Sequence, residues 1–532
     1  MNAALTQVFE GYLDLRYRVD PVEGTRAGRR ELDGMYGAFD AASVRAHIAA
    51  LRSYTGALEE ASADTLDDEI DQTAMLHDAR QLQATLERER PFAHDPTFHL
   101  RHALDGLHRL TAALDLDERG RAAALVARLR ALPAFLSTAD DALAQPARPL
   151  LGTAAAMIPG GLTLLRDDVR EALGPLLEDA EVASVHGAAA ESLERFADAL
   201  ALMEERGRDN VAIGREAFER RLHTAHMIPD GVDPLLRWAE REYETARAAV
   251  QAAAAAIAPG VPWRDVVDRV RGDGVPTASL AGAYADAMDA ARRFAAERGL
   301  VQVVSAPVRV MATPEYLEPL VPFAAYDGPG AFSTSQAGTL YVTMPRGAGA
   351  RGGAHRQADI ASAVVHEVIP GHHQQVVTAN ASDRVARRVV TSDAAREGWA
   401  YYCETMMAEA GFFSTPEARL LHARDVLWRA LRAIIDVAVH TKALTTAGAR
   451  KRLRDELGLD ETTAHGEVMR VAMHPTLMSC FVVGRREVER LRNSARSAWV
   501  DAGGFSLSRF HAELLGYGGY PTALARWGMG LA

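Results

Sequence analysis

Most of the chain consists of stretches in which apolar residues recur every three or four positions, a spacing that places them on one face of an α-helix. Residues 76–86 and 122–132 are clear examples, and comparable stretches run through most of the 532 residues. An alanine-rich stretch over 246–259 fits the same interpretation, because alanine is the best helix former. The pattern therefore predicts a mainly α protein.

Two short segments depart from the helical spacing. Residues 301–311 and 338–345 are rich in valine and threonine, which is typical of β-strands. A glycine-rich loop is expected over 347–353. If the second strand lies at the exposed edge of a sheet, it can hold an extended peptide through main-chain hydrogen bonds. Tyr341, in that strand, is then a candidate for contact with a substrate.

The length of the chain exceeds what one small hydrophobic core can organise, so we expect one large helical body with two lobes, or two domains. The boundary is placed at Gly207. An N-terminal helical lobe would cover 1–206, and a second lobe over 207–532 would contain both predicted strands.

Composition narrows the class of protein further. Hydrophobic residues make up 48% of the chain and charged residues 24%, the balance of an ordinary soluble protein. The net charge of -12 disfavours nucleic acid as a partner, since phosphate binding needs concentrated lysine and arginine. A cationic or amine-bearing substrate would suit an acidic protein, but net charge bears mainly on solubility.

Cysteine usage and apolar runs bear on location. Cys403 and Cys480 are the only cysteines, too few for a disulfide framework in a chain of this size. The first residues lack the basic and apolar regions of a signal peptide, and no uninterrupted apolar run reaches membrane-spanning length. We therefore expect a cytoplasmic protein with no membrane partner.

The candidate chemistry begins where His366 and Glu367 end an apolar helical run. A catalytic zinc site needs imidazole and carboxylate ligands, an open position and a separate carboxylate base. On a straight helix a second imidazole would stand four residues after the first, but that position is Pro370, which has no ligand atom. His373 faces the right way but lies about 10.5 Å along the axis, and His372 is rotated by roughly 120°. A break after Pro370 would supply the missing rotation, so the pattern leaves both histidines open.

A helical stretch further along the chain carries two more acids. Glu397, Tyr401 and Glu404 share one face of this helix. We assign Glu397 as the third metal ligand and Glu404 as an acceptor that orients an imidazole N–H. Glu367 is then the general base that activates water. Gly398 is unfavourable inside a helix unless a close approach requires it, and we expect it to face the helix that carries the histidine.

The string His366-Glu-Val-Ile-Pro-Gly-His-His-Gln-Gln375 resembles the HExxPGHHxQ signature of a zincin-like bacterial family, the domain of unknown function eight-eight-five. Members of that family resemble helical metallopeptidases, and some are described as X-prolyl dipeptidyl aminopeptidase-like. The resemblance implies a zincin-like helical fold with a small β-sheet beside the metal-binding helix. It covers nearly the whole chain, in the segments 12–16, 313–317, 338–343, 467–475, 481–486 and 510–515.

The resemblance also bears on single residues. The second histidine of the pair looks replaceable by an aromatic residue in the family, which favours His372 over His373 as the ligand. The segment from Glu397 to Ala400 is similar to the Glu-Gly-Phe-Ala helix of gluzincin aminopeptidases, whose glutamate binds zinc.

One departure from the family concerns Phe481, which stands where tyrosine is usual. If that hydroxyl stabilises an oxyanion in the family, activity here is weaker, different, or served by another residue: Tyr401, Tyr402 or His474. Arg470 and Arg485 lie in the same matched block and are candidates for clamping a substrate carboxylate. Each alone is more often the partner of an acidic side chain.

These observations predict a zinc-dependent hydrolase that holds one Zn²⁺ ion per chain. Its expected substrate is a short peptide or an aminoacyl conjugate, cleaved at an amide bond by activated water. Two other classes stay open. One is an amide hydrolase dedicated to a single small metabolite, and the other is a non-catalytic helical binding protein that keeps the fold.

Overall fold

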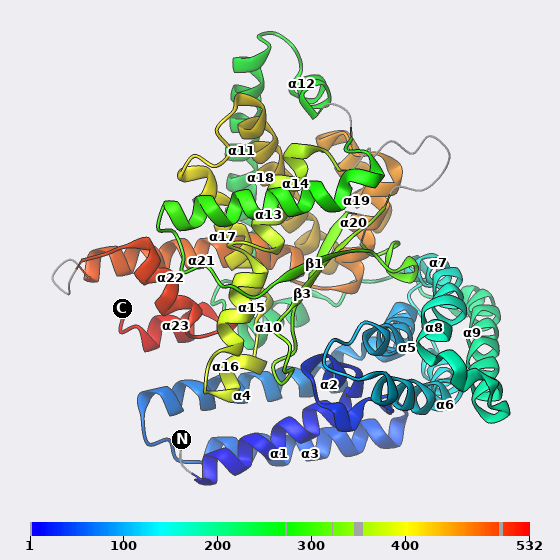
Figure 1. The fold of residues 1–532 in the computed structure, drawn as a ribbon. Helices are drawn as coiled ribbons and strands as arrows, with labels where there is room; N and C mark the ends of the chain where they lie inside the picture. The colour runs from blue at the N-terminus through cyan, green and yellow to red at the C-terminus, as the bar shows by residue number, and fades with distance from the viewer. Residues whose placement is uncertain (1–2, 272–273, 322, 345–354, 500–503, 532) are drawn as a thin grey trace. The chain divides into compact units, whose positions relative to one another are not determined.

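The computed structural model describes residues 3–271, 274–321, 323–344, 355–499 and 504–531. These residues are predominantly helical, as the apolar pattern predicts (Figure 1). The glycine-rich loop expected over 347–353 lies outside the described residues. Contacts group the chain into two compact units.

The first unit contains Met1–Val211 and two short later segments, Pro314–Leu320 and Pro329–Gln336. Its helices are α1 (Ala3–Val19), α2 (Pro21–Ala27), α3 (Ala41–Glu60), α4 (Leu66–Ala84), α5 (Pro96–Thr111), α6 (Glu118–Ala142), α7 (Arg148–Leu164), α8 (Arg170–Leu173) and α9 (Ala180–Arg206).

Four of these helices form the centre of the first unit, with α6 and α7 each packed against both α5 and α9. Aspartates begin two of them: the Asp95 carboxylate accepts a hydrogen bond from the amide of Thr97, and Asp117 does the same for Gly120. These are ordinary N-caps, which satisfy amides that have no partner within the helix. By length and mean hydropathy (1.3), α6 is apolar enough to cross a membrane, a property shared by helices buried in a bundle.

The second unit contains Ala212–Thr313, Val321–Gly328 and Ala337–Ala532. Its helices are α10 (Arg215–His226), α11 (Val232–Ile257), α12 (Trp263–Arg271), α13 (Leu280–Glu297), α14 (Gln357–Glu367), α15 (His372–Asn380), α16 (Val385–Val389), α17 (Asp393–Glu409), α18 (Pro416–His440), α19 (Thr446–Leu457), α20 (Glu461–Met473), α21 (Leu477–Ala498), α22 (Leu507–Leu515) and α23 (Thr522–Gly528).

One small sheet accompanies these helices, with strand order β1-β3-β2. The central strand β3 (Gly338–Val342) pairs in parallel with β1 (Val308–Ala312) and antiparallel with β2 (Ala324–Asp327). The predicted edge position of the second strand is therefore wrong, because β3 is paired on both sides and buried along its length. The outer strand on the antiparallel side is β2, which the sequence pattern did not indicate.

The strand predicted over 301–311 is also shorter than expected, since pairing begins only at Val308. The earlier valines are used differently: Val301, Val303 and Val304 pack in a helical core together with Leu340 of β3. Hydrophobic density marked these positions as buried, but it did not distinguish a strand from an extended segment that lies against helices. The same core includes Val364 of α14, so the sheet packs beside the helix that carries His366.

Candidate metal centre

The helix that carries His366 ends directly after it. Helix α14 stops at Glu367, and a new helix, α15, begins at His372. Between them a cis peptide bond precedes Pro370. A side chain at Gly371 is impossible here, because its Cβ would stand 1.8 Å from the carbonyl oxygen of His366. The break predicted at Pro370 and Gly371 is therefore complete, and it separates two helices rather than bending one.

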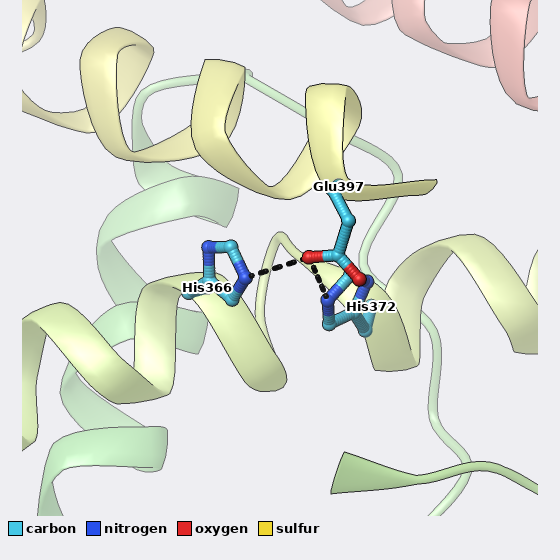
Figure 2. A group of neighbouring side chains, drawn as sticks. All are labelled: His366, His372 and Glu397. Carbon is cyan, nitrogen blue, oxygen red and sulfur yellow. Dashed lines mark ion pairs between the residues drawn. The ribbon is translucent and has the colours of Figure 1, made fainter. Parts of the chain in front are cut away.

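This break brings three potential ligands together (Figure 2). Nε2 of His366 lies 3.4 Å from Oε2 of Glu397, and Nε2 of His372 lies 3.5 Å from the same oxygen. One ligand atom from each of the three residues lies within 4.8 Å of the others. All three side chains are buried. Among the described residues this is the one group of three histidine, cysteine or acidic side chains arranged closely enough to hold an ion.

The spacing suits a small cation. Zinc–ligand distances of about 2.0–2.2 Å in a tetrahedral site place neighbouring ligand atoms roughly 3.4 Å apart. Two of the three separations match that value. The rings of His366 and His372 are nearly perpendicular, at 86°, with centroids 4.9 Å apart. Both Nε2 atoms can therefore approach one point beside Glu397.

Glu404 lies behind His366, two turns further along α17 than Glu397. Its Oε1 is 2.7 Å from Nδ1 of His366 and 2.6 Å from a guanidinium nitrogen of Arg429. Because the carboxylate can only accept, Nδ1 carries the proton, and Nε2 is the nitrogen that faces Glu397. This is the arrangement by which a carboxylate orients a metal-binding imidazole, and it is the place predicted for Glu404.

Negative charge dominates the cluster. Burial alone disfavours a charged imidazole, but hydrogen bonds to Glu397 and Glu404 raise the pKa of His366 to about 9. Burial also disfavours a charged Glu397, yet Arg396 and the two histidines hold the pKa of that carboxyl well below its usual value. The two carboxylates thus favour a positive charge between the imidazoles, whether a proton or a metal ion carries it.

The predicted base lies beside this cluster. Glu367 follows His366 directly and is half-buried. Its Oε2 accepts a hydrogen bond from the main-chain amide of Tyr326, at 3.1 Å. Residue 326 pairs with Leu340 in the antiparallel ladder, while the neighbouring amide of Thr343 bonds to the carbonyl of Phe323. In an antiparallel ladder the amides alternate in direction, so the amide of Tyr326 points away from β3. The outer side of β2 therefore lies next to Glu367.

His373 is turned away from the cluster, although it is adjacent to His372 in the sequence. Its Nε2 lies 2.9 Å from the carbonyl oxygen of Ala306 and must donate to it. Its Nδ1 then accepts from the hydroxyl of Tyr326, at 2.7 Å. Burial lowers the pKa of His373 to about 4. Both ring nitrogens are occupied by the protein, so the geometry selects His372 from the pair that the pattern left open.

The other predicted site residues lie around the cluster rather than in it. Tyr341 belongs to the central strand, on the face opposite Leu340, which packs in the core with α14. Tyr401 is buried, and its hydroxyl accepts from Arg485 at 3.4 Å. Arg470 lies 3.5 Å from Glu467. Both arginines are therefore already near protein oxygens, and Arg485 is also paired with two carboxylates, those of Glu242 and Glu489.

The expected partner of Gly398 is wrong. This glycine faces Gly484 of α21, not α14, and a Cβ at position 398 would lie 2.4 Å from the backbone of Gly484. Two glycines on facing helices permit this close contact between α17 and α21. The sequence shows that Gly398 serves a close approach, but local spacing carries no information about which distant helix supplies the other side.

Two arginines of α18 have roles that the sequence did not indicate. Arg429 bonds to Glu404, and the guanidinium of Arg432 stands 4.8 Å from the ring centroid of Phe481. The ring of Phe481 in turn stacks on that of His366, with centroids 5.7 Å apart and planes 12° apart. Phe481 is thus in direct contact with a candidate metal ligand. No local signal marked Arg429 or Arg432, since their partners are distant in the sequence.

The fold and the cluster define a mainly helical protein with a buried candidate site for a cation, built from two histidines and a glutamate. The family model for a bacterial protein of unknown function (DUF885) matches residues 21–528, and the chain belongs to this family. No curated protein matches it.

Two solved structures share the fold. One, titled "a putative lipoprotein of unknown function from Shewanella oneidensis", has a TM-score of 0.80 and 20% sequence identity, over 99% of this chain and 100% of that one. The other, "the putative lipoprotein from Colwellia psychrerythraea", has a TM-score of 0.84 and 16% identity, over 99% of both chains. At this level of identity the likeness shows the shared fold and assigns no activity to this chain.

These descriptions correct the predicted location. Lipoproteins are anchored to membranes through a lipid, so the comparison contradicts a cytoplasmic location, and that prediction is wrong. The cues behind it were weak for a physical reason. Two cysteines, both buried and free, indicate only that no disulfide framework is present, and an exported protein with a large hydrophobic core does not need one.

Proposed function

We propose that this protein is a zinc-dependent hydrolase that cleaves amide bonds in short peptides or aminoacyl conjugates. The observation that carries the proposal is the convergence of His366, His372 and Glu397, whose ligand atoms lie within 4.8 Å of one another. Nitrogen and carboxylate oxygen donors of this kind suit Zn²⁺. A zinc ion held there would supply Lewis acidity toward a carbonyl group and toward water.

The residues around the cluster fit distinct tasks. Glu404, bonded to Arg429, holds His366 in the tautomer that presents Nε2. Glu367 is held by the amide of Tyr326 with its second carboxylate oxygen available, so it accepts a proton from water and passes it to the leaving amine. β2 is the outer strand of the sheet beside Glu367, and an extended peptide substrate would lie along this side.

The experiment compares the wild type with Glu367→Gln. Both proteins are purified without chelators, their zinc content is measured, and each is assayed on a panel of short peptides and aminoacyl amides. We expect about one zinc per chain in both and a loss of turnover of about 10²–10⁴-fold in the variant. Glu417→Gln, at an exposed position of α18, is the matched control and should behave as the wild type.

Other outcomes discriminate between the remaining classes. Zinc in both proteins with no turnover on any amide would contradict a hydrolase and favour a metal-containing binding protein. Turnover confined to one small-molecule amide would indicate a dedicated amide hydrolase. Equal turnover in the wild type and Glu367→Gln would exclude Glu367 as the base, and absence of metal after zinc is supplied would overturn the site itself.

A further inference from the structure

The first unit contains a hollow that is unrelated to the metal centre. It lies between α6 and the segment that leads into α3, and its volume is about 220 Å³. Small side chains on one face of α6 leave this space open, among them Ala131, Ala134 and Ala139. A cavity of roughly 150 Å³ is large enough for benzene, so this one has room for a substituted single ring.

Several aromatic rings line part of the hollow. The rings of Tyr36 and Phe135 stack, with centroids 4.6 Å apart and planes 18° apart. Phe39 presents its ring nearly perpendicular to that of His99, with centroids 6.2 Å apart. Aromatic rings favour aromatic partners in stacked or edge-to-face geometry. This part of the lining therefore suits an aromatic ring.

One polar atom in this wall lacks a partner. His99 is 1% exposed, and its Nε2 lies 2.7 Å from the carbonyl oxygen of Phe92. Since a carbonyl only accepts, Nε2 carries the proton and Nδ1 is an acceptor. Nδ1 has no hydrogen-bond partner among the described residues. A buried acceptor without a partner favours any ligand that brings a donor to it.

Charge in the hollow points to a neutral ligand. Burial lowers the pKa of His99 to about 4, so the ring is uncharged at neutral pH. The one acidic side chain of the lining, Asp40, is occupied at the start of α3, where it accepts hydrogen bonds from the amides of Ala42 and Ser43 and from the Ser43 hydroxyl. A cationic ligand would find no free carboxylate among these lining residues.

We propose that this hollow is a binding site for a small neutral aromatic molecule that carries one O–H or N–H donor, of the phenol class. Its ring lies among Tyr36, Phe39 and Phe135, and its donor bonds to Nδ1 of His99. The site is separate from the proposed hydrolase chemistry and does not depend on it.

The test uses two probes of nearly equal size, 4-fluorophenol and 4-fluorotoluene. Fluorine NMR measures the binding of each probe to the full chain. We expect saturable binding of 4-fluorophenol at one site per chain, about tenfold tighter than 4-fluorotoluene, because one hydrogen bond separates them. Ala131→Leu fills the hollow and should abolish binding of both probes. Ala123→Leu makes the same change at an exposed position of the same helix and should leave binding unchanged.

A further variant tests the polar contact. His99→Phe should remove the preference for 4-fluorophenol and leave 4-fluorotoluene binding largely as it was. Thermal unfolding establishes that each variant is folded, and if Ala131→Leu is not, Ala134→Leu at the exposed rim takes its place. The proposal is overturned if wild type binds neither probe, if it binds both equally, or if a folded filling variant binds as the wild type does.

Discussion

Two buried histidines, His366 in the second unit and His99 in the first, show how one hydrogen-bond partner decides what an imidazole can bind. In His366 one nitrogen bonds to the carboxylate of Glu404, and the pKa of the ring is raised to about 9. In His99 one nitrogen bonds to the carbonyl of Phe92, and burial lowers the pKa to about 4. Both residues keep a second nitrogen for a ligand.

The difference lies in the charge that surrounds that second nitrogen. Around His366, two carboxylates create a place for a cation, and the second nitrogen is a candidate metal ligand. Around His99 no free carboxylate is present among the lining residues, so the free nitrogen is only a hydrogen-bond acceptor. Equal burial of two histidines therefore does not imply equal function.

The largest effect is expected from removing a ligand of the proposed metal centre. His372→Ala should weaken zinc binding by about 10²–10⁴-fold, if one of three ligands supplies about a third of the roughly 10–16 kcal/mol typical of protein zinc sites. Competition with a chromogenic chelator measures the affinity. His373→Phe is the matched control, because His373 is bonded to Ala306 and Tyr326; equal losses in both variants would contradict the assignment.

Glu404→Gln should have a smaller effect on the same affinity. The amide can still accept from Nδ1 of His366, but it lacks the negative charge that makes the ring a better ligand. Such changes typically weaken metal binding by about 10–100-fold. Glu409→Gln, on the same helix and paired with Arg492 instead, should leave the affinity unchanged. If charge on Glu404 were irrelevant, the two variants would give the same value.

Stability tests the backbone contact that supports Glu397. Gly398→Ala forces a Cβ to within 2.4 Å of Gly484 and should lower the free energy of unfolding by roughly 1–3 kcal/mol, as overpacking does. Gly466→Ala, in α20, meets nothing within 4 Å and should raise it by up to about 1 kcal/mol, because alanine favours the helix. Urea denaturation measures both, and a stable Gly398→Ala protein would show that α17 and α21 are free to separate.

The smallest effect is a shift in the titration of His102, one turn after His99 on α5. Burial disfavours its charged form, but Asp20, 3.1 Å away, raises the pKa of His102 above its ordinary value. This pair therefore stabilises the fold below about pH 6.5, and the contribution is lost as the pH rises through the folded-state pKa.

Asp20→Asn tests whether the charge of Asp20 raises the pKa of His102. Asparagine can still cap α2, where Asp20 accepts from the amide of Glu23, so the change removes mainly the charge. NMR titration of the imidazole protons should show that the pKa of His102 falls, while the pKa of His99 stays low. An unchanged pKa of His102 would show that the Asp20 carboxylate does not control the charge of this imidazole.

The mainly helical class was predictable because apolar spacing is a local property and is repeated over most of the chain. The approach of His366, His372 and Glu397 was predictable in part, because a Pro-Gly break and a glutamate helix follow each other at short range. Helical spacing did not choose between His372 and His373, and only the resemblance favoured His372, since Ala306 and Tyr326, which occupy His373, are distant in the sequence.

Other features depend on distant contacts in the same way. The strand order that places β3 in the centre of the sheet follows from pairing with β2, whose short sequence carries no clear alternation. The partner of Gly398 and the roles of Arg429 and Arg432 likewise depend on α18 and α21. Only the assembled second unit shows which surfaces meet.

The bond from the Tyr326 amide to Glu367 has a consequence for how this protein can change over evolutionary time. The main chain, and not a side chain, orients the proposed base, so no ordinary side-chain substitution at position 326 deletes the donor, and only proline would. The side chain of Tyr326 bonds to His373. Its replacement would remove that contact but not the hydrogen bond from the amide to Glu367. The orientation of Glu367 is therefore robust to mutation at position 326, because it depends on the backbone of β2.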